Sequence, residues 1–229
     1  MVKIKTVQFS KNKVSDIFFP AQFSTFKADW KEALSHNSFI IKLFSALGVL
    51  GLIGVFIPSF FGYIQSVQGY QINDLILNEI PVRNMSVYIF LLIYSVIILG
   101  IINLINNPVL FIKCLQAYCL LVLIRMVCLY LVPLEPERSI IPLEDPFLAQ
   151  FFYSGHAITK DLFFSGHVST MVLLTLALPF FPLKYIFAAT TIIVAGLIMV
   201  QHVHYSIDVI AAPFFSWLSF WLIGLLTGK

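Results

Sequence analysis

Two short motifs in the second half of the chain hold residue types that can carry out nucleophilic and acid–base chemistry. His204 and Asp208 are four positions apart, so they would share one face of a helix. The carboxylate can accept a hydrogen bond from one imidazole nitrogen, which leaves the other nitrogen available as a nucleophile. In Ser165-Gly166-His167, the glycine lets backbone approach a ligand closely, and amides at a helix start attract phosphate oxygens. His167 can give a proton to a leaving oxygen.

The tripeptide Ser-Gly-His occurs a second time, at residues 154–156. His167 is followed directly by an apolar run, which predicts that it lies at a helix start near the bilayer surface. His156 is followed by Ala-Ile-Thr-Lys-Asp, which is typical of a loop. We therefore assign the chemistry to His167 and interpret His156 as a solvated loop histidine, with a contact at the rim of the site or with a head group as the alternative.

The composition indicates that these motifs are positioned by helices in a membrane. Of the 229 residues, 59% are hydrophobic and 11% are charged, and the mean hydropathy is +0.94. Soluble domains carry about 25% charged residues, so we expect an all-α, polytopic membrane protein. No cleavable signal peptide is expected. The three cysteines share one apolar run at spacings that match neither a zinc site nor a disulfide framework, so we interpret them as packing residues.

Six apolar runs have a suitable length for transmembrane helices, because about 20 residues cross the hydrocarbon core. We expect residues 1–38 to form a cytoplasmic tail with an amphipathic segment at about 26–39, and residues 39–229 to form one six-span catalytic domain. The predicted spans are residues 39–57, 86–105, 109–132, 163–181, 185–203 and 206–226.

Three breaks separate consecutive runs. Pro58 is expected to end the first span, and Asn106-Asn107-Pro108 separates the second from the third. Residues 181–184 predict a tight turn between the fourth and fifth spans.

The distribution of basic residues predicts the orientation of the spans. Ten of the fourteen Lys and Arg residues fall on one side of the predicted bundle, so both termini should be cytoplasmic. The acidic loop at 133–162, the start of the fourth span and the junction of the fifth and sixth spans then lie outside. The ten residues are Lys3, Lys5, Lys11, Lys13, Lys27, Lys31, Lys42, Lys113, Lys184 and Lys229.

Arg125 adds a cation to the same outer leaflet. It lies seven residues before the expected end of the third span at Val132, or roughly 10 Å below that end. Ionisable side chains from the third, fourth and sixth spans therefore converge at one level. Charged residues inside spans usually mark function, which favours an outer-side active site over a polar network that only locks helices together.

The two motifs resemble those of a known family. Asp161-Leu-Phe-Phe-Ser165-Gly166-His167 and His204-Tyr205-Ser206-Ile207-Asp208-Val209 are similar to the signatures of sphingomyelin synthase-like proteins, within the type 2 phosphatidic acid phosphatase superfamily. The resemblance covers residues 39–226 and implies six spans, cytoplasmic termini and an exoplasmic active site. Arg125 matches an arginine of a further motif near the end of the third span. The sequence departs from the family pattern at Val168, where Thr is usual, and at Pro133 and Pro136.

The resemblance also implies a role for each matched residue. His204 would attack phosphorus with Asp208 as its partner, and His167 would protonate the leaving diacylglycerol and then act as base on the incoming hydroxyl. The donor would be a glycerophospholipid with a phosphocholine or phosphoethanolamine head group, and the acceptor would be ceramide or a similar lipid alcohol, as in sphingolipid metabolism. Residues implied in binding phosphate and substrate are Arg125, Ser165, Gly166, Asp161 and Tyr205.

A lipid phosphate phosphatase is the first alternative. The related phosphatases carry Lys-x6-Arg-Pro and a Ser-Arg pair before the nucleophile, and neither is present in this sequence. A phosphomonoester carries two negative charges, which favours several cations, whereas a phosphodiester carries one. The chain has three arginines, Arg83, Arg125 and Arg138, so the charge balance favours a transferase.

Two further alternatives involve the histidine pair. His202 and His204 could hold a metal ion, but on a helix side chains two positions apart point in nearly opposite directions. A proton-coupled transporter would use His and Asp as a relay, although the inverted repeats of many transporters are not evident. We therefore expect no metal, no cofactor and no nucleic-acid partner. The protein should lie in the cell membrane, of the bacterial inner-membrane type.

Overall fold

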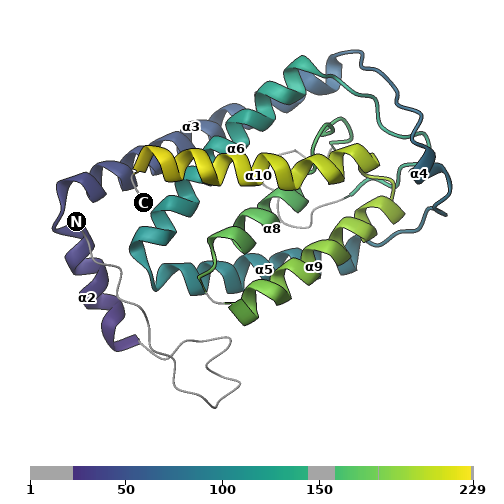
Figure 1. The fold of residues 1–229 in the computed structure, drawn as a ribbon. Coiled ribbons are helices and arrows are strands. Elements are labelled where there is room, and N and C mark those ends of the chain that lie inside the picture. Colours follow the sequence, from purple (N-terminus) through teal and green to yellow (C-terminus); the bar gives the residue numbers. More distant parts are fainter. Residues whose placement is uncertain (1–22, 144–157, 180, 228–229) are drawn as a thin grey trace.

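The computed structural model describes residues 23–143, 158–179 and 181–227, and this part of the chain folds into a helical bundle (Figure 1). The all-α prediction is confirmed for these residues. The helices are α2 (Phe23–Leu34), α3 (Asn37–Ser66), α4 (Leu75–Asn78), α5 (Ser86–Ile105), α6 (Pro108–Leu131), α8 (Gly166–Ala177), α9 (Phe181–Val200) and α10 (Ser206–Thr227).

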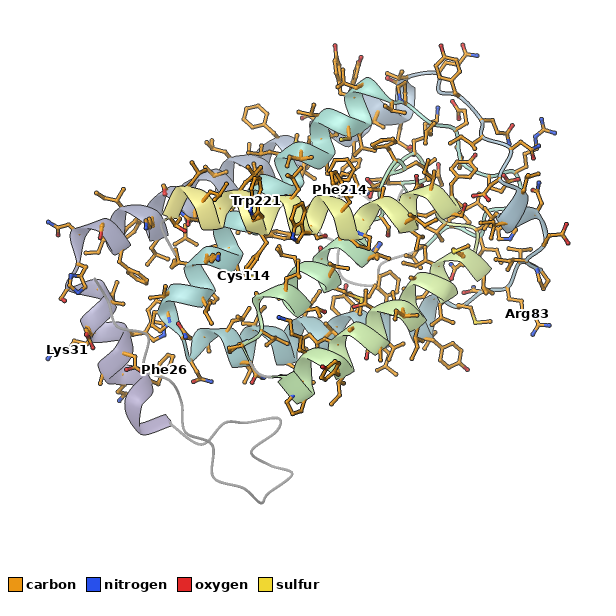
Figure 2. The ribbon with its side chains drawn as sticks, in the orientation of Figure 1. Phe26, Lys31, Arg83, Cys114, Phe214 and Trp221 are labelled. Carbon is orange, nitrogen blue, oxygen red and sulfur yellow. The ribbon has the colours of Figure 1, made fainter. Side chains whose placement is uncertain are left out.

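Five helices, α3, α5, α6, α9 and α10, are long and apolar enough to cross a membrane. The chain is therefore an integral membrane protein with several spans. Many of its large apolar side chains point away from the bundle, and Phe214 and Trp221 on α10 are 55% and 45% exposed (Figure 2). Lipid tails would cover such side chains, which explains why the chain can dispense with a polar surface.

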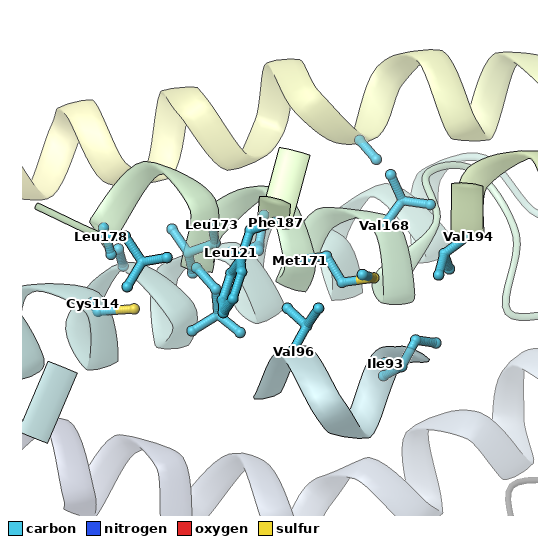
Figure 3. Packing of buried hydrophobic residues seen from close by; sticks show 14 of the residues in the cluster. Ile93, Val96, Cys114, Leu121, Val168, Met171, Leu173, Leu178, Phe187 and Val194 are labelled. Atoms are coloured by element: carbon cyan, nitrogen blue, oxygen red, sulfur yellow. The ribbon is translucent and has the colours of Figure 1, made fainter. Parts of the chain in front are cut away.

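The run predicted as a span at 163–181 forms a shorter helix. α8 has 12 residues and is about 18 Å long, against the 30 Å of a hydrocarbon core. It ends because Leu178 precedes Pro179 and takes an extended conformation, as residues before proline prefer. Neighbouring helices bury most of α8 in place of lipid. Its residues Met171 and Leu173 are 0% and 1% exposed, and they pack with Val96 and Leu121 in the core (Figure 3).

Two predicted helix boundaries at prolines are wrong. Pro58 lies inside α3, which continues to Ser66, because membrane helices tolerate proline more readily than soluble ones do. Residues 181–184 do not form a separate turn: α9 begins at Phe181, with Pro182 in its first turn, where a missing N–H costs no helical hydrogen bond. Pro108, by contrast, opens α6 directly after the Asn107 cap, so the break predicted there is confirmed.

The N-terminal helix α2 packs against one end of the bundle. The Trp30 indole Nε1 donates to the Ile105 carbonyl oxygen at 2.7 Å, and its ring lies 6.0 Å from that of Phe39 and 5.8 Å from that of Phe111. The segment predicted as amphipathic at 26–39 is thus interrupted, since α2 ends at Leu34 and α3 starts at Asn37. Lys31 on this helix and Arg83 lie at opposite ends of the molecule (Figure 2).

Two connections fold over the other end of the bundle, and we call residues 67–85 and 132–143 the cap. The cap includes α4, which lies beside the ends of α9 and α10 that their junction joins (Figure 1). Its two segments pair through Tyr70 N to Pro133 O and Glu135 N to Tyr70 O, both at 2.9 Å. Gly69 permits this pairing, because a Cβ there would lie 2.7 Å from the Leu134 carbonyl carbon. The cap therefore covers the end of the bundle at which the junction of α9 and α10 lies.

Candidate active site

His204 lies in a non-helical junction between α9 and α10, at residues 201–205. The expectation that His204 and Asp208 share a helical face is therefore wrong in its geometry, because α10 starts only at Ser206. The contact itself is present: His204 Nδ1 lies 3.2 Å from Asp208 Oδ2. The same carboxylate oxygen accepts from the Tyr205 main-chain nitrogen at 3.2 Å. Asp208 thus holds both the ring and the backbone of the junction.

The His204 contact defines the tautomer of the ring. A carboxylate only accepts, so Nδ1 carries the hydrogen and neutral Nε2 carries a lone pair. The pair is deeply buried, with His204 3% and Asp208 1% exposed. Within the described part of the chain, the second carboxylate oxygen, Oδ1, is buried without a hydrogen-bond partner.

The Ser165-Gly166-His167 turn is joined to this pair through the backbone. Ser165 N donates to the Asp208 carbonyl oxygen at 3.1 Å, which ties the start of α8 to the first turn of α10. Ser165 Oγ accepts from Val168 N at 3.4 Å and caps α8. His167 is consequently the second residue of a helix, where orphan amides and the helix dipole favour anions.

His167 is partly buried rather than solvated. Its ring meets that of Phe90 edge-on, with 6.2 Å between centroids. The aromatic neighbour on α5 limits the positions that the imidazole can take.

Arg125 lies directly against the same turn. A Cβ added at Gly166 would lie 3.1 Å from both Cζ and Nε of the guanidinium, so a side chain there would push the arginine away by a few tenths of an ångström. Arg125 Nη1 donates to the Phe164 carbonyl oxygen, and Nη2 donates to the Asp161 carbonyl oxygen at 3.2 Å. The guanidinium also lies 5.5 Å from the centre of the Phe164 ring. These contacts fix the arginine beside the N-terminus of α8.

Asp161 pairs with this arginine. Its Oδ1 lies 2.5 Å from Arg125 Nη2. The two groups form an ion pair, but their angles do not meet the geometry of a hydrogen bond. The sequence predicts that Asp161 takes part in binding substrate phosphate, and in the structure its carboxylate lies against the Arg125 guanidinium. Its neighbour Lys160 contacts Glu135 at 2.8 Å, and this hydrogen bond is the main reason why the pKa of Glu135 is lowered.

Tyr205 points to the cap. Its hydroxyl donates to the Glu135 carbonyl oxygen at 2.8 Å, the residue is 1% exposed, and burial raises the pKa of the phenol. The sequence predicts that Tyr205 contacts substrate, and in the structure its hydroxyl joins the junction to the cap segment at 132–143.

His202 also turns to the cap. Its backbone has a φ of 57°, and its Nε2 donates to the Ile80 carbonyl oxygen at 2.9 Å, while Nδ1 lies 2.6 Å from Ser139 Oγ. His202 and His204 lie in a non-helical junction, so the opposite directions that two such side chains take on a helix are not imposed here. Both ring nitrogens of His202 are nevertheless engaged by the cap.

Sequence reasoning missed two residues that hold the junction. Gln201 is 0% exposed; its Oε1 accepts from Met85 N at 2.9 Å and its Nε2 donates to Ser86 Oγ at 2.8 Å. Gln201 directly follows an apolar run, and a polar side chain in that position predicts a buried hydrogen bond.

The second missed residue is Asp74, which joins the cap to α10. Its Oδ2 accepts from Ser206 N at 2.6 Å, and its Oδ1 accepts from Ile76 N and Leu77 N at 3.1 Å. Burial acts to raise the pKa of Asp74, but these hydrogen bonds outweigh it and hold the pKa below its ordinary value. From the sequence, an aspartate at this position indicates at most the N-cap of a helix, which Asp74 is for α4.

His156, the histidine of the first Ser-Gly-His copy, lies outside the described residues. No protein-family model matches this sequence, and no curated protein matches it.

Proposed function

We propose that this chain is an integral-membrane lipid phosphotransferase that moves a phospho-head group from a glycerophospholipid to a lipid alcohol through a phosphohistidine at His204. One chain of contacts carries the proposal. The Asp208 side chain contacts His204 Nδ1, and the Asp208 carbonyl oxygen accepts from Ser165 N. Gly166, which follows Ser165, packs against Arg125. A nucleophile, a helix N-terminus and a cation are thereby joined at one place.

In the first half-reaction, the lone pair of His204 Nε2 attacks phosphorus and the bond to the diacylglycerol oxygen breaks. The buried Asp208 carboxylate stabilises the positive charge that develops on the imidazole. His167, in its protonated form, gives its proton to the leaving oxygen. Arg125 and the amides at the start of α8 stabilise the negative charge on the phosphoryl oxygens.

In the second half-reaction, His167 is neutral and can accept a proton. It takes this proton from the hydroxyl of the incoming lipid alcohol, whose oxygen attacks phosphorus. The bond between phosphorus and Nε2 of His204 breaks, and His204 and His167 return to their starting protonation states. Water in place of the alcohol would give hydrolysis by the same steps.

The burial of the site favours an alcohol over water as acceptor. His204 and Asp208 are almost inaccessible, and the cap covers the end of the bundle at which they lie. We assign this end to the outer leaflet from the distribution of lysines. The resemblance to sphingomyelin synthase-like proteins supports a phosphocholine or phosphoethanolamine donor and a ceramide-like acceptor.

The test is a product analysis with purified protein in vesicles. Phospholipid donors that differ in head group are supplied with ceramide, with diacylglycerol or with no added acceptor, and the products are identified by mass spectrometry. The proposal expects a new phospholipid that appears only with an alcohol acceptor and only with intact His204. Release of phosphate or of a free phospho-head group at the same rate without any acceptor would indicate a hydrolase instead.

A further inference from the structure

The contacts of Arg125 fall into two kinds. Two main-chain carbonyl oxygens, from Asp161 and Phe164, accept from its Nη atoms. Among the residues that the structure describes, its further charged partner is the Asp161 carboxylate at 2.5 Å. The side chain of Arg125 is 9% exposed and that of Asp161 is 31% exposed. The arginine is therefore the fixed partner, and the carboxylate is the one that can turn away without disturbing the backbone.

Lys160, the residue before Asp161, makes its contacts with other parts of the structure. Lys160 Nζ contacts Glu135 Oε1 and donates to the Val67 carbonyl oxygen, both at 2.8 Å. Its main-chain nitrogen donates to Gln65 Oε1 at 2.9 Å. These contacts hold the Lys160 charge against the cap. Arg125 is thus the cation that packs on the Ser-Gly-His turn, and its charge is balanced by Asp161.

We propose that Asp161 is a specificity-determining residue, which restricts the anion site on Arg125 to singly charged phosphodiesters and disfavours doubly charged phosphomonoesters. The inference rests on the proposed function, since it takes Arg125 as the group that binds phosphate. An incoming phosphodiester takes the place of the carboxylate on the guanidinium, while the two carbonyl contacts remain. The displaced carboxylate stays attached to the same short turn, a few ångströms from the phosphate.

The charge of the ligand then decides the outcome. Repulsion between the displaced carboxylate and the ligand acts once on a monoanion and about twice on a dianion. The attraction of Arg125 grows in the same proportion, so Arg125 and Asp161 together form a nearly neutral pair. The second charge of a dianion therefore gains little at this pair and still loses its hydration. Asp161 therefore separates the two ligand classes by repulsion, in addition to any attraction that the site offers to the correct one.

The experiment measures binding, so that it does not depend on turnover. Purified full-length protein in detergent is titrated with inorganic phosphate and with dimethyl phosphate at pH 8, where the first is mainly a dianion and the second a monoanion. The variants are Asp161→Asn, Asp161→Glu and Arg125→Ala, with Glu79→Gln as the control, because Glu79 is an exposed carboxylate of the cap. Circular dichroism and thermal unfolding verify that each variant is folded.

The expected result is a change in the ratio of the two affinities. Wild type and Glu79→Gln should prefer dimethyl phosphate, whereas Asp161→Asn should bind inorganic phosphate about tenfold more tightly than wild type does. Affinity for dimethyl phosphate should rise by a smaller factor, Asp161→Glu should keep the wild-type preference, and Arg125→Ala should bind neither ligand. A merely structural role would change both affinities together.

An unchanged affinity ratio in folded Asp161→Asn would overturn the proposal. Failure of both ligands to bind wild type would overturn it as well, since no anion site would then exist on Arg125. Either result leaves the phosphotransferase proposal standing if transfer products and a labelled His204 are found. Conversely, a ratio that shifts in a protein without transfer products would support the anion site and refute the transferase.

Discussion

The Asp208 carbonyl oxygen accepts a hydrogen bond from the Ser165 main-chain nitrogen at 3.1 Å, and this contact joins two motifs that lie far apart in the sequence. Asp208 is therefore shared: its side chain orients His204, and its backbone positions the turn that carries His167. The acid and the nucleophile of the proposed reaction are held relative to one another by a single residue at the start of α10.

Gly166→Ala should lower the rate of transfer by about 10- to 100-fold, because the new methyl group would lie 3.1 Å from the Arg125 guanidinium and displace it. The measurement is kcat and KM for transfer in vesicles. Gly196→Ala is the matched control, since Gly196 lies in α9 and a Cβ there meets nothing within 4 Å. Equal activity of the two variants would show that the close packing of Arg125 on the turn is irrelevant to function.

Asp208→Asn should label His204 more slowly by about 10³- to 10⁴-fold. The amide keeps the shape of the side chain but removes the negative charge that stabilises the imidazolium, and it can hold the wrong tautomer. The rate of phosphohistidine formation, followed by rapid quench, gives the measurement. A rate within a few-fold of wild type would refute the orienting role of Asp208.

His167→Ala should slow both half-reactions with a phospholipid donor, yet spare the first when the leaving group needs no proton. With a donor whose leaving group is nitrophenol, the variant should still phosphorylate His204, and the label should accumulate because the second hydroxyl is not activated. His156→Ala should behave like wild type within a few-fold. Loss of activity in His156→Ala that matched His167→Ala would assign the chemistry to the other Ser-Gly-His copy.

Asp74→Asn should lower the melting temperature at pH 7 by about 2–4 °C, the shift that about 1 kcal/mol produces in a chain of this length. The pKa of Asp74 is below the ordinary value of 3.8 in the folded state. Its stabilising contribution is therefore complete above that value and lost as the pH falls through the folded-state pKa.

The pH series provides the decisive comparison for Asp74. Thermal unfolding of wild type and Asp74→Asn should differ most at pH 6–7, and the difference should shrink below about pH 4. Glu79→Gln, which removes an exposed carboxylate of the same cap, should follow wild type throughout. A difference that grows in acid would mean that Asp74 is not held as the anion.

The sequence predicted best the features that depend on local pattern. The bounds of α5, α6 and α10 follow from long, mainly apolar runs, and Asn107-Pro108 marks a helix start through capping and proline chemistry. Proline was given too much weight as a helix terminator at two other positions. Pro58 lies inside α3, where a membrane helix accommodates the lost hydrogen bond, and Pro182 lies in the first turn of α9, where no hydrogen bond is lost. The short length of α8 was missed, since apolar residues after Ala177 continue the hydropathy but not the helix.

The site was predictable in its residue types and less so in its geometry. The contact between His204 and Asp208 was expected from a helix, yet a turn before α10 produces it. The cap contacts could not be read from the sequence, because Gln201 reaches Met85 and Asp74 reaches Ser206 across more than 100 residues. Such partners depend on tertiary packing, and no local period indicates them.

The most direct test of the central claim is to find where the phosphoryl group is attached during turnover. Purified protein is incubated briefly with a phospholipid that carries ³²P in its head-group phosphate, quenched in alkali, digested and analysed by mass spectrometry. The account predicts an acid-labile, alkali-stable phosphate on His204, absent in His204→Ala and chased into product by a lipid alcohol. Product formation by wild type without this intermediate, or a label on any other residue, would contradict it.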